Sequence, residues 1–146
     1  MKTHDNHPMD PSKSDGIILI VDDEQFLREY TRYVLEQSGF HVVTAADGEE
    51  AWSFYRSNQE RIALIITDVV MPGSFDGFEL ADRVHRTCPT LKVLFMTGAL
   101  GDDHPRFAEL SANNRILLKP FFPDQLIQIV KQSCFDTGSI PRRITR

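Results

Sequence analysis

The chain has 146 residues, a length that suits one domain with a single well-filled core. Its apolar content of 41% and charged content of 25% are ordinary for a globular protein, and its formal net charge is −5 at pH 7. The acidic balance argues against direct contact with nucleic acid, and no apolar run is long enough for membrane insertion or for a secretory signal. We therefore expect a cytoplasmic protein.

The N-terminal part of the chain predicts a tail, a strand and a helix. Residues 1–15 are polar, contain two prolines and show no period, which is typical of a disordered tail before a domain at 16–135. The continuous apolar run over 17–21 predicts a strand that is covered on both faces. Apolar residues at helical spacing over 24–38 predict a helix, and Gly39 is a natural stop just after it.

The next segment repeats the alternation of strand and helix. The β-prone residues 40–44 predict a short edge strand. Asp47 with Glu50 three residues later is a variant of the capping box, which marks the start of a second helix. A third apolar run over 62–67 predicts a strand that leads directly to Asp68.

The last third of the chain continues this pattern and ends in a second tail at 136–146. It predicts a helix over 78–87, a strand over 92–96, a short helix opened by Pro105, a strand over 115–118 and a helix opened by Pro123. Strands joined by helix-length crossovers must be parallel, and right-handed crossovers place helices on both faces of the sheet. The sequence thus predicts one α/β domain with five parallel strands and five helices.

Four of the predicted strands end in residues suited to phosphate or metal chemistry. Asp22 and Asp23 follow the first strand, Asp68 the third, Thr97 the fourth and Lys119 the fifth. Ligands of open parallel sheets bind beyond the carboxyl ends of the strands. We therefore expect these five side chains to meet at one site.

Three carboxylates at one edge of a sheet repel each other. Two such charges about 4 Å apart interact by roughly 4 kcal/mol at an effective dielectric of about 20. One lysine offsets this repulsion only in part, so a divalent cation is the expected guest, and oxygen ligands favour Mg²⁺ or Mn²⁺ over zinc. A metal, a lysine and a hydroxyl group together suit a phosphoryl group, which an aspartate can accept as an acyl phosphate.

Five stretches of the sequence, in order over residues 17–134, resemble the receiver domain of two-component response regulators. They are IILIVDDE, LIITDVVMP, FDGFEL, VLFMTG and LLKPF. The resemblance implies a flavodoxin-like (βα)5 fold with strand order 2-1-3-4-5, which the pattern of elements alone leaves open.

The same resemblance implies roles for the acidic residues. Asp68 matches the aspartate that accepts phosphate from a partner's phosphohistidine. Asp23 matches the direct ligand of Mg²⁺, and Asp22 supports the metal, often through water. Asp68 itself and the backbone carbonyl of Val70 complete the protein's ligands to the metal.

The remaining roles belong to Thr97 and Lys119. Thr97 matches the hydroxyl residue that turns toward the phosphoryl group, and Lys119 matches the lysine that pairs with it. The resemblance also implies a cis peptide bond between Lys119 and Pro120.

Two features depart from the family pattern. The loop over 72–77 is one residue longer than the commonest form. Ile116 stands three residues before the lysine, where the family usually has Tyr or Phe. We expect signalling in this chain to depend less on a side-chain rotation at position 116.

The resemblance implies a phosphoacceptor that is charged by a sensor histidine kinase or a histidine phosphotransfer protein and signals to an unknown downstream protein. It would catalyse only the phosphorylation and dephosphorylation of its own aspartate, and so is not an enzyme in the ordinary sense. Only residues 135–146 follow Cys134, which favours a stand-alone receiver, as a monomer or weak dimer.

Three alternatives stay open at this point. The chain could be the receiver module of a larger hybrid sensor kinase or DNA-binding regulator. It could be a phosphatase with an aspartate nucleophile, although such enzymes commonly carry a second acid where Val70 stands. It could also be a degenerate receiver that binds partners without phosphorylation, against which the complete acidic set argues.

Overall fold

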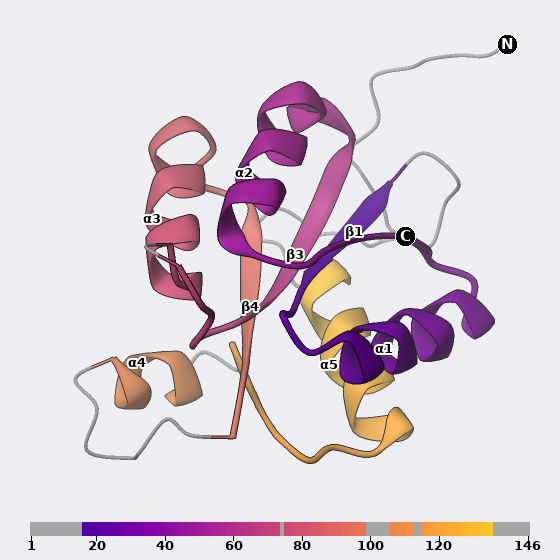
Figure 1. Ribbon diagram of the computed structural model, residues 1–146. Coiled ribbons are helices and arrows are strands. Elements are labelled where there is room, and N and C mark those ends of the chain that lie inside the picture. The colour runs from indigo at the N-terminus through magenta and orange to yellow at the C-terminus, as the bar shows by residue number, and fades with distance from the viewer. Residues whose placement is uncertain (1–15, 74, 99–105, 113–114, 136–146) are drawn as a thin grey trace, which may run out of the picture.

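The computed structural model describes residues 16–73, 75–98, 106–112 and 115–135. Both predicted tails lie outside these residues, and so does the predicted helix start at Pro105. The described residues form a parallel β-sheet with helices on both of its faces (Figure 1).

The five strands all run parallel. They are β1 (Ile17–Val21), β2 (His41–Ala45), β3 (Ile62–Asp68), β4 (Lys92–Thr97) and β5 (Ile116–Leu118), and they lie in the order β2-β1-β3-β4-β5. This is the order that the family resemblance implied. β3 and β4 each extend one residue further than predicted, so Asp68 and Thr97 are the last residues of their strands.

The helices follow the predicted pattern closely. They are α1 (Gln25–Gln37), α2 (Gly48–Ser57), α3 (Gly77–Thr87), α4 (Phe107–Ala112) and α5 (Pro123–Phe135), with a short 3₁₀ turn, η1 (Gln59–Arg61), that was not predicted. The capping box at α2 is confirmed, because the Asp47 side chain accepts a hydrogen bond from the Glu50 amide at 2.8 Å. Glu50 returns a bond by accepting from the Ala46 amide at 2.8 Å, one residue before the cap.

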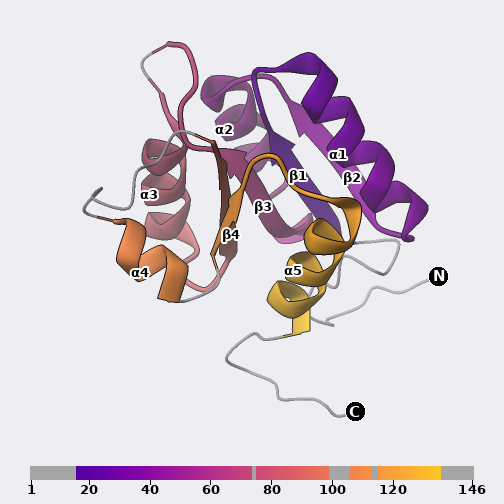
Figure 2. The ribbon, with the colours of Figure 1, turned by 90° about the horizontal axis from the view of Figure 1, so that it is seen from below.

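Two hydrophobic cores cover the two faces of the sheet. Helices α1 and α5 pack on one face, and α2, α3 and α4 pack on the other (Figure 2). Alternate residues of β1 serve the two cores: Leu19 and Val21 face α2 and α3, whereas Ile18 and Ile20 face α1 and α5. Burial on both faces explains why the strands are continuous apolar runs.

An irregularity in β3 sets which way its last residue points. The pairing with β1 steps from Ile17 opposite Ile62 to Ile18 opposite Leu64, so Ala63 is passed over. After this step, Leu64 and Ile66 face the α1 and α5 side. Because side chains alternate along a strand, Asp68 falls in phase with Leu64 and Ile66.

No helix in the described part of the chain combines the length and the apolar character that crossing a bilayer requires.

Candidate functional site

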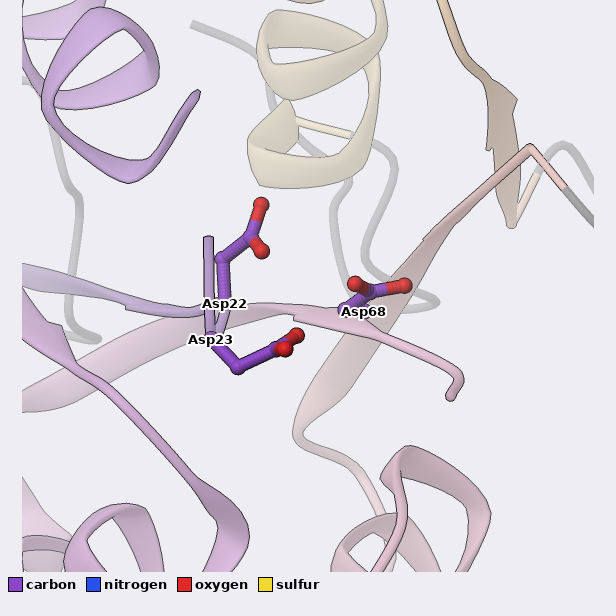
Figure 3. A group of neighbouring side chains, drawn as sticks. All are labelled: Asp22, Asp23 and Asp68. Carbon is purple, nitrogen blue, oxygen red and sulfur yellow. The ribbon is translucent and has the colours of Figure 1, made fainter. Parts of the chain in front are cut away.

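Three aspartates meet where β1 and β3 end. Asp22 and Asp23 follow β1, and Asp68 is the last residue of β3. One carboxylate oxygen from each residue lies within 4.8 Å of the others, and the three side chains project into the same space (Figure 3). The clustering predicted from the sequence is confirmed.

The alternation of the strands decides which acids are buried. Asp22 continues the phase of Ile18 and Ile20, so it lies on the same side of the sheet as Asp68. Asp22 is fully buried and Asp68 is 8% exposed, whereas Asp23 has the opposite phase and is exposed. Two buried carboxylates thus lie beside one that reaches solvent.

Lys119 forms ion pairs with two of the three aspartates of this cluster. Its Nζ donates a hydrogen bond to Asp68 Oδ2 at 3.2 Å and lies 3.5 Å from Asp22 Oδ2. The lysine follows β5 directly, and its backbone N–H donates to the carbonyl of Thr97 at 2.9 Å. The Lys119–Pro120 peptide bond is cis, as the resemblance implied.

One buried oxygen of Asp22 lacks a hydrogen-bond partner. Asp22 Oδ1 accepts from the Glu24 backbone N–H at 2.9 Å, but Oδ2 accepts none within the described part of the chain. The 3.5 Å contact with Lys119 is long for a hydrogen bond and offsets the charge only in part. A buried carboxylate oxygen without a donor is a site that a cation would satisfy.

Burial raises the pKa of Asp22 and of Asp68 above the ordinary 3.8. In both residues the loss of hydration is the largest cause, and it outweighs the lowering by Lys119. Nearby carboxylates raise each pKa further: Asp68 and Asp23 act on Asp22, and Asp23 acts on Asp68. The protein therefore holds more negative charge at this site than its own lysine neutralises.

Thr97 and Val70 lie at the same edge of the sheet. Thr97 is the last residue of β4, is 1% exposed and directly follows Met96, the register partner of Asp68. Val70 is the second residue after β3 and is 64% exposed. All the residues predicted for the site therefore lie at or just beyond strand ends.

The loop after β3 supports the site in a way that the sequence analysis missed. Phe75 is 6% exposed, and the guanidinium carbon of Arg83 lies 4.4 Å from the centre of its ring. Gly77 packs directly on the backbone of Asp68, where an added Cβ would overlap the carbonyl oxygen. The presence of a large aromatic residue, Phe75, between Gly73 and Gly77 could have indicated this packing from the sequence.

Arg28 is a second residue that the sequence analysis missed. Its Nη1 donates a hydrogen bond to the backbone carbonyl of Asp22 at 2.7 Å. The available signal was a cation near the N-terminus of a helix, where the helix dipole disfavours positive charge.

The donor set of the site fits a hard divalent cation. It consists of carboxylate oxygens, one of which is buried and accepts no hydrogen bond from the residues that the structure describes. The cluster as a whole carries a net negative charge. This acidic cluster could bind a metal ion.

A family model and individual relatives agree on the kind of protein. Residues 18–131 match the response regulator receiver domain model. The response regulator receiver protein CpdR of Brucella abortus is 33% identical over 119 residues, which cover 79% of this chain and 93% of that protein. The sensor kinase/phosphatase CqsS of Vibrio cholerae is 32% identical over 126 residues, which cover 84% of this chain but 18% of that protein.

The fold is shared with solved structures as well. The Vibrio cholerae chemotaxis protein CheY4 superposes with a TM-score of 0.70 at 29% identity, over 82% of this chain and 99% of that one. The strand order, the acidic cluster and the match over most of the chain point to the same conclusion. The chain belongs to the receiver domain family of two-component response regulators.

Proposed function

We propose that this receiver is a Mg²⁺-dependent phosphoacceptor in which Asp68 takes a phosphoryl group from the phosphohistidine of a sensor histidine kinase or a histidine phosphotransfer protein. One observation carries the proposal. A buried carboxylate, Asp68, lies within 3.2 Å of a lysine and within 4.8 Å of two further acids whose charge that lysine does not neutralise.

The side chains divide the work of the transfer. An oxygen of Asp68 forms the new bond to phosphorus as the phosphorus–nitrogen bond of the phosphohistidine breaks, and the electron pair leaves with the imidazole. Lys119 gives up its contact with Asp68 and pairs with the phosphoryl oxygens, while the hydroxyl of Thr97 donates a hydrogen bond to them. Phosphoryl transfer depends mainly on such positioning and charge stabilisation.

Asp22, Asp23, Asp68 and the backbone carbonyl of Val70 would hold the metal. When bound, Mg²⁺ neutralises charge on the transferring group, and Mn²⁺ could replace it because both accept oxygen ligands. Asp23 is exposed and can bind the ion directly, whereas the buried Asp22 supports it, through water or through its oxygen that lacks a hydrogen bond.

The chain would act on its own aspartate and on no other substrate. It would signal by a conformational change that a downstream protein reads, as a monomer or weak dimer in the cytoplasm. The relative CqsS, whose name describes a sensor kinase/phosphatase, contains a segment like this chain, which supports a kinase as the source of phosphate.

The same relative favours one alternative context. This chain matches 18% of CqsS but 93% of CpdR, so related segments occur both within a long kinase and as nearly a whole short protein. A module of a larger hybrid kinase would perform the same phosphoacceptor chemistry. An independent phosphatase is disfavoured by Val70, which cannot serve as an acid.

The direct test is the intact mass of the protein after incubation with acetyl phosphate and Mg²⁺. We expect the wild type to gain one phosphoryl group and Asp68→Asn to gain none. Asp124→Asn is the matched control, because Asp124 is an exposed acid in the first turn of α5. Equal phosphorylation of the Asp68→Asn variant would defeat the assignment, and so would the absence of any gain in the wild type.

A further inference from the structure

Asp22 is held by hydrogen bonds at three of its four polar atoms. Its backbone N–H donates to the Ala45 carbonyl at 3.1 Å, and its Oδ1 accepts from the Glu24 N–H at 2.9 Å. Its backbone carbonyl accepts from Arg28 Nη1 at 2.7 Å. The fourth atom, Oδ2, has no hydrogen bond among the described residues and lies 3.5 Å from Lys119 Nζ.

We propose that Arg28 is a positioning residue that holds the turn between β1 and α1, so that Oδ2 of Asp22 and the following Asp23 stay directed at the metal site. The inference rests on the proposed metal site and adds a residue that does not itself contact the metal. The other two bonds join Asp22 to backbone groups of Ala45 and Glu24, which remain when those residues are substituted. The bond from the Arg28 side chain is therefore the one that substitution of the partner residue removes.

The position of Arg28 lets it connect the strand to the helix. Its own backbone N–H donates to the Glu24 carbonyl at 2.9 Å in the first turn of α1, while its side chain reaches back to the end of β1. The Asp22 carbonyl belongs to the peptide plane that begins Asp23. A bond to this oxygen therefore restrains the orientation of both acids.

The charge of Arg28 and its proposed positioning role predict opposite effects of its removal on Mg²⁺ binding. The guanidinium of Arg28 bonds to the backbone of Asp22 and is positively charged, so it repels an incoming cation, and its removal should strengthen Mg²⁺ binding if the charge were all that mattered. If positioning dominates, removal of Arg28 should weaken Mg²⁺ binding instead. Groups that orient metal ligands commonly contribute about tenfold or more to metal affinity. The sign of the change separates the two roles.

The experiment measures Mg²⁺ affinity by NMR titration without any phosphodonor. Arg28→Met and Arg28→Gln both favour helix but lose the long donor, and Arg28→Lys keeps a donor of similar reach. Arg32→Met is the matched control, because Arg32 is one turn further along α1 and pairs with Glu29 and Glu36 on the exposed surface. It removes the same charge from the same helix without touching Asp22.

We expect Arg28→Met and Arg28→Gln to raise the Mg²⁺ dissociation constant about tenfold, and Arg28→Lys to recover most of the affinity. Arg32→Met should leave the constant unchanged or lower it slightly. The phosphorylation rate of Arg28→Met should approach that of the wild type at saturating Mg²⁺, since the acceptor itself is intact. Amide hydrogen exchange at Glu24 should accelerate in Arg28→Met, which reports the loosened turn without any metal.

If the wild type binds Mg²⁺ and a folded Arg28→Met or Arg28→Gln variant binds it equally well or more tightly, the positioning role of Arg28 is overturned. The proposed metal site would then still stand. Absence of Mg²⁺ binding in the wild type would overturn the proposed metal site and this inference with it. Since Arg28 is only half-buried, we expect both Arg28→Met and Arg28→Gln to fold. If Arg28→Met does not fold, Arg28→Gln provides the same comparison.

Discussion

At the scale of single residues, the charge balance of the site is set by two buried carboxylates that share one lysine. Asp22 and Asp68 lose most of their hydration, and Lys119 lies near an oxygen of each. Their raised pKa values show that desolvation outweighs this pairing. The charges of these two desolvated carboxylates therefore destabilise the metal-free protein.

The first prediction concerns the stability of Asp68→Asn without metal. The folded-state pKa of Asp68 lies above the unfolded value of 3.8, so the folded protein binds more protons and the residue's contribution to stability is lost as pH rises through the folded pKa. At pH 7 we expect Asp68→Asn to raise the free energy of unfolding by about 1 kcal/mol, an ordinary size for one substitution.

Urea unfolding in a chelating buffer, between about pH 4 and pH 7, measures this effect. The gain of Asp68→Asn over the wild type should be smallest at the acidic end, where the wild-type carboxyl group becomes protonated. Asp124→Asn should show no comparable trend. A gain that is constant across this range, or a less stable Asp68→Asn variant at pH 7, would contradict the interpretation.

At the scale of secondary-structure elements, the loop between β3 and α3 makes close contacts with two helices. Phe75 lies against the first residue of α2, where a Cβ added to Gly48 would come within 2.7 Å of its ring. The guanidinium of Arg83 in α3 lies over the same ring. Phe75 is thus packed against two helices, and Asp76 starts α3 by accepting a hydrogen bond from the Glu79 amide at 2.8 Å.

The second prediction tests how closely this loop approaches Asp68, the proposed acceptor. The Gly77 N–H donates to the Val69 carbonyl at 2.9 Å, and an added Cβ would overlap the carbonyl oxygen of Asp68. We expect Gly77→Ala to lower the free energy of unfolding by about 1–3 kcal/mol, because the contacting atoms belong to the backbone. It should also slow phosphorylation by acetyl phosphate by displacing the end of β3.

Gly98→Ala is the control for Gly77→Ala at the same edge of the sheet. A Cβ at Gly98 would lie 3.5 Å from the nearest atom, on Lys119, which is an ordinary contact. We expect it to change the free energy of unfolding by less than about 0.5 kcal/mol in urea titrations. Equal effects of the two substitutions would show that the close approach at Gly77 is unimportant.

The two separate cores matter at the scale of the whole molecule. Neighbouring residues of β5 belong to different cores, because Leu117 packs with the α1 and α5 side and Ile116 packs against the α2, α3 and α4 side. A displacement of β5 would therefore affect the packing on both faces of the sheet. Ile116 is half-buried, and its branched aliphatic side chain has no ring to rotate.

The third prediction concerns Ile116 during activation. We expect its methyl groups to stay packed on the same core when beryllofluoride, a phosphoryl mimic, is added with Mg²⁺. Methyl NMR with contacts to Phe95 or Leu110, which lie in that core, measures this directly. Exchange of Ile116 between buried and exposed positions would contradict the expectation, and methyl signals of Leu117 serve as the comparison from the other core.

Most of the architecture could be predicted from the sequence, because the physical signals are local. Apolar runs, glycine stops and the Asp47 capping box are read within a few residues, and the elements they mark agree with the structure to within one or two residues. The position of the site followed as well, because parallel strands deliver their carboxyl ends to one edge. The strand order required the family resemblance.

The tertiary structure decided which acids are buried and which residues hold them. These features depend on the alternation of side chains along the strands and on contacts between segments that are distant in the sequence. The step past Ala63 sets the direction of Asp68, and the alternation of β1 buries Asp22 rather than Asp23. The bond from Arg28 to Asp22 and the packing of Phe75 on Arg83 also join separate elements. A local pattern carries no information on these distances, so the sequence placed the acids at one edge, and only the fold determined which are buried and what holds them.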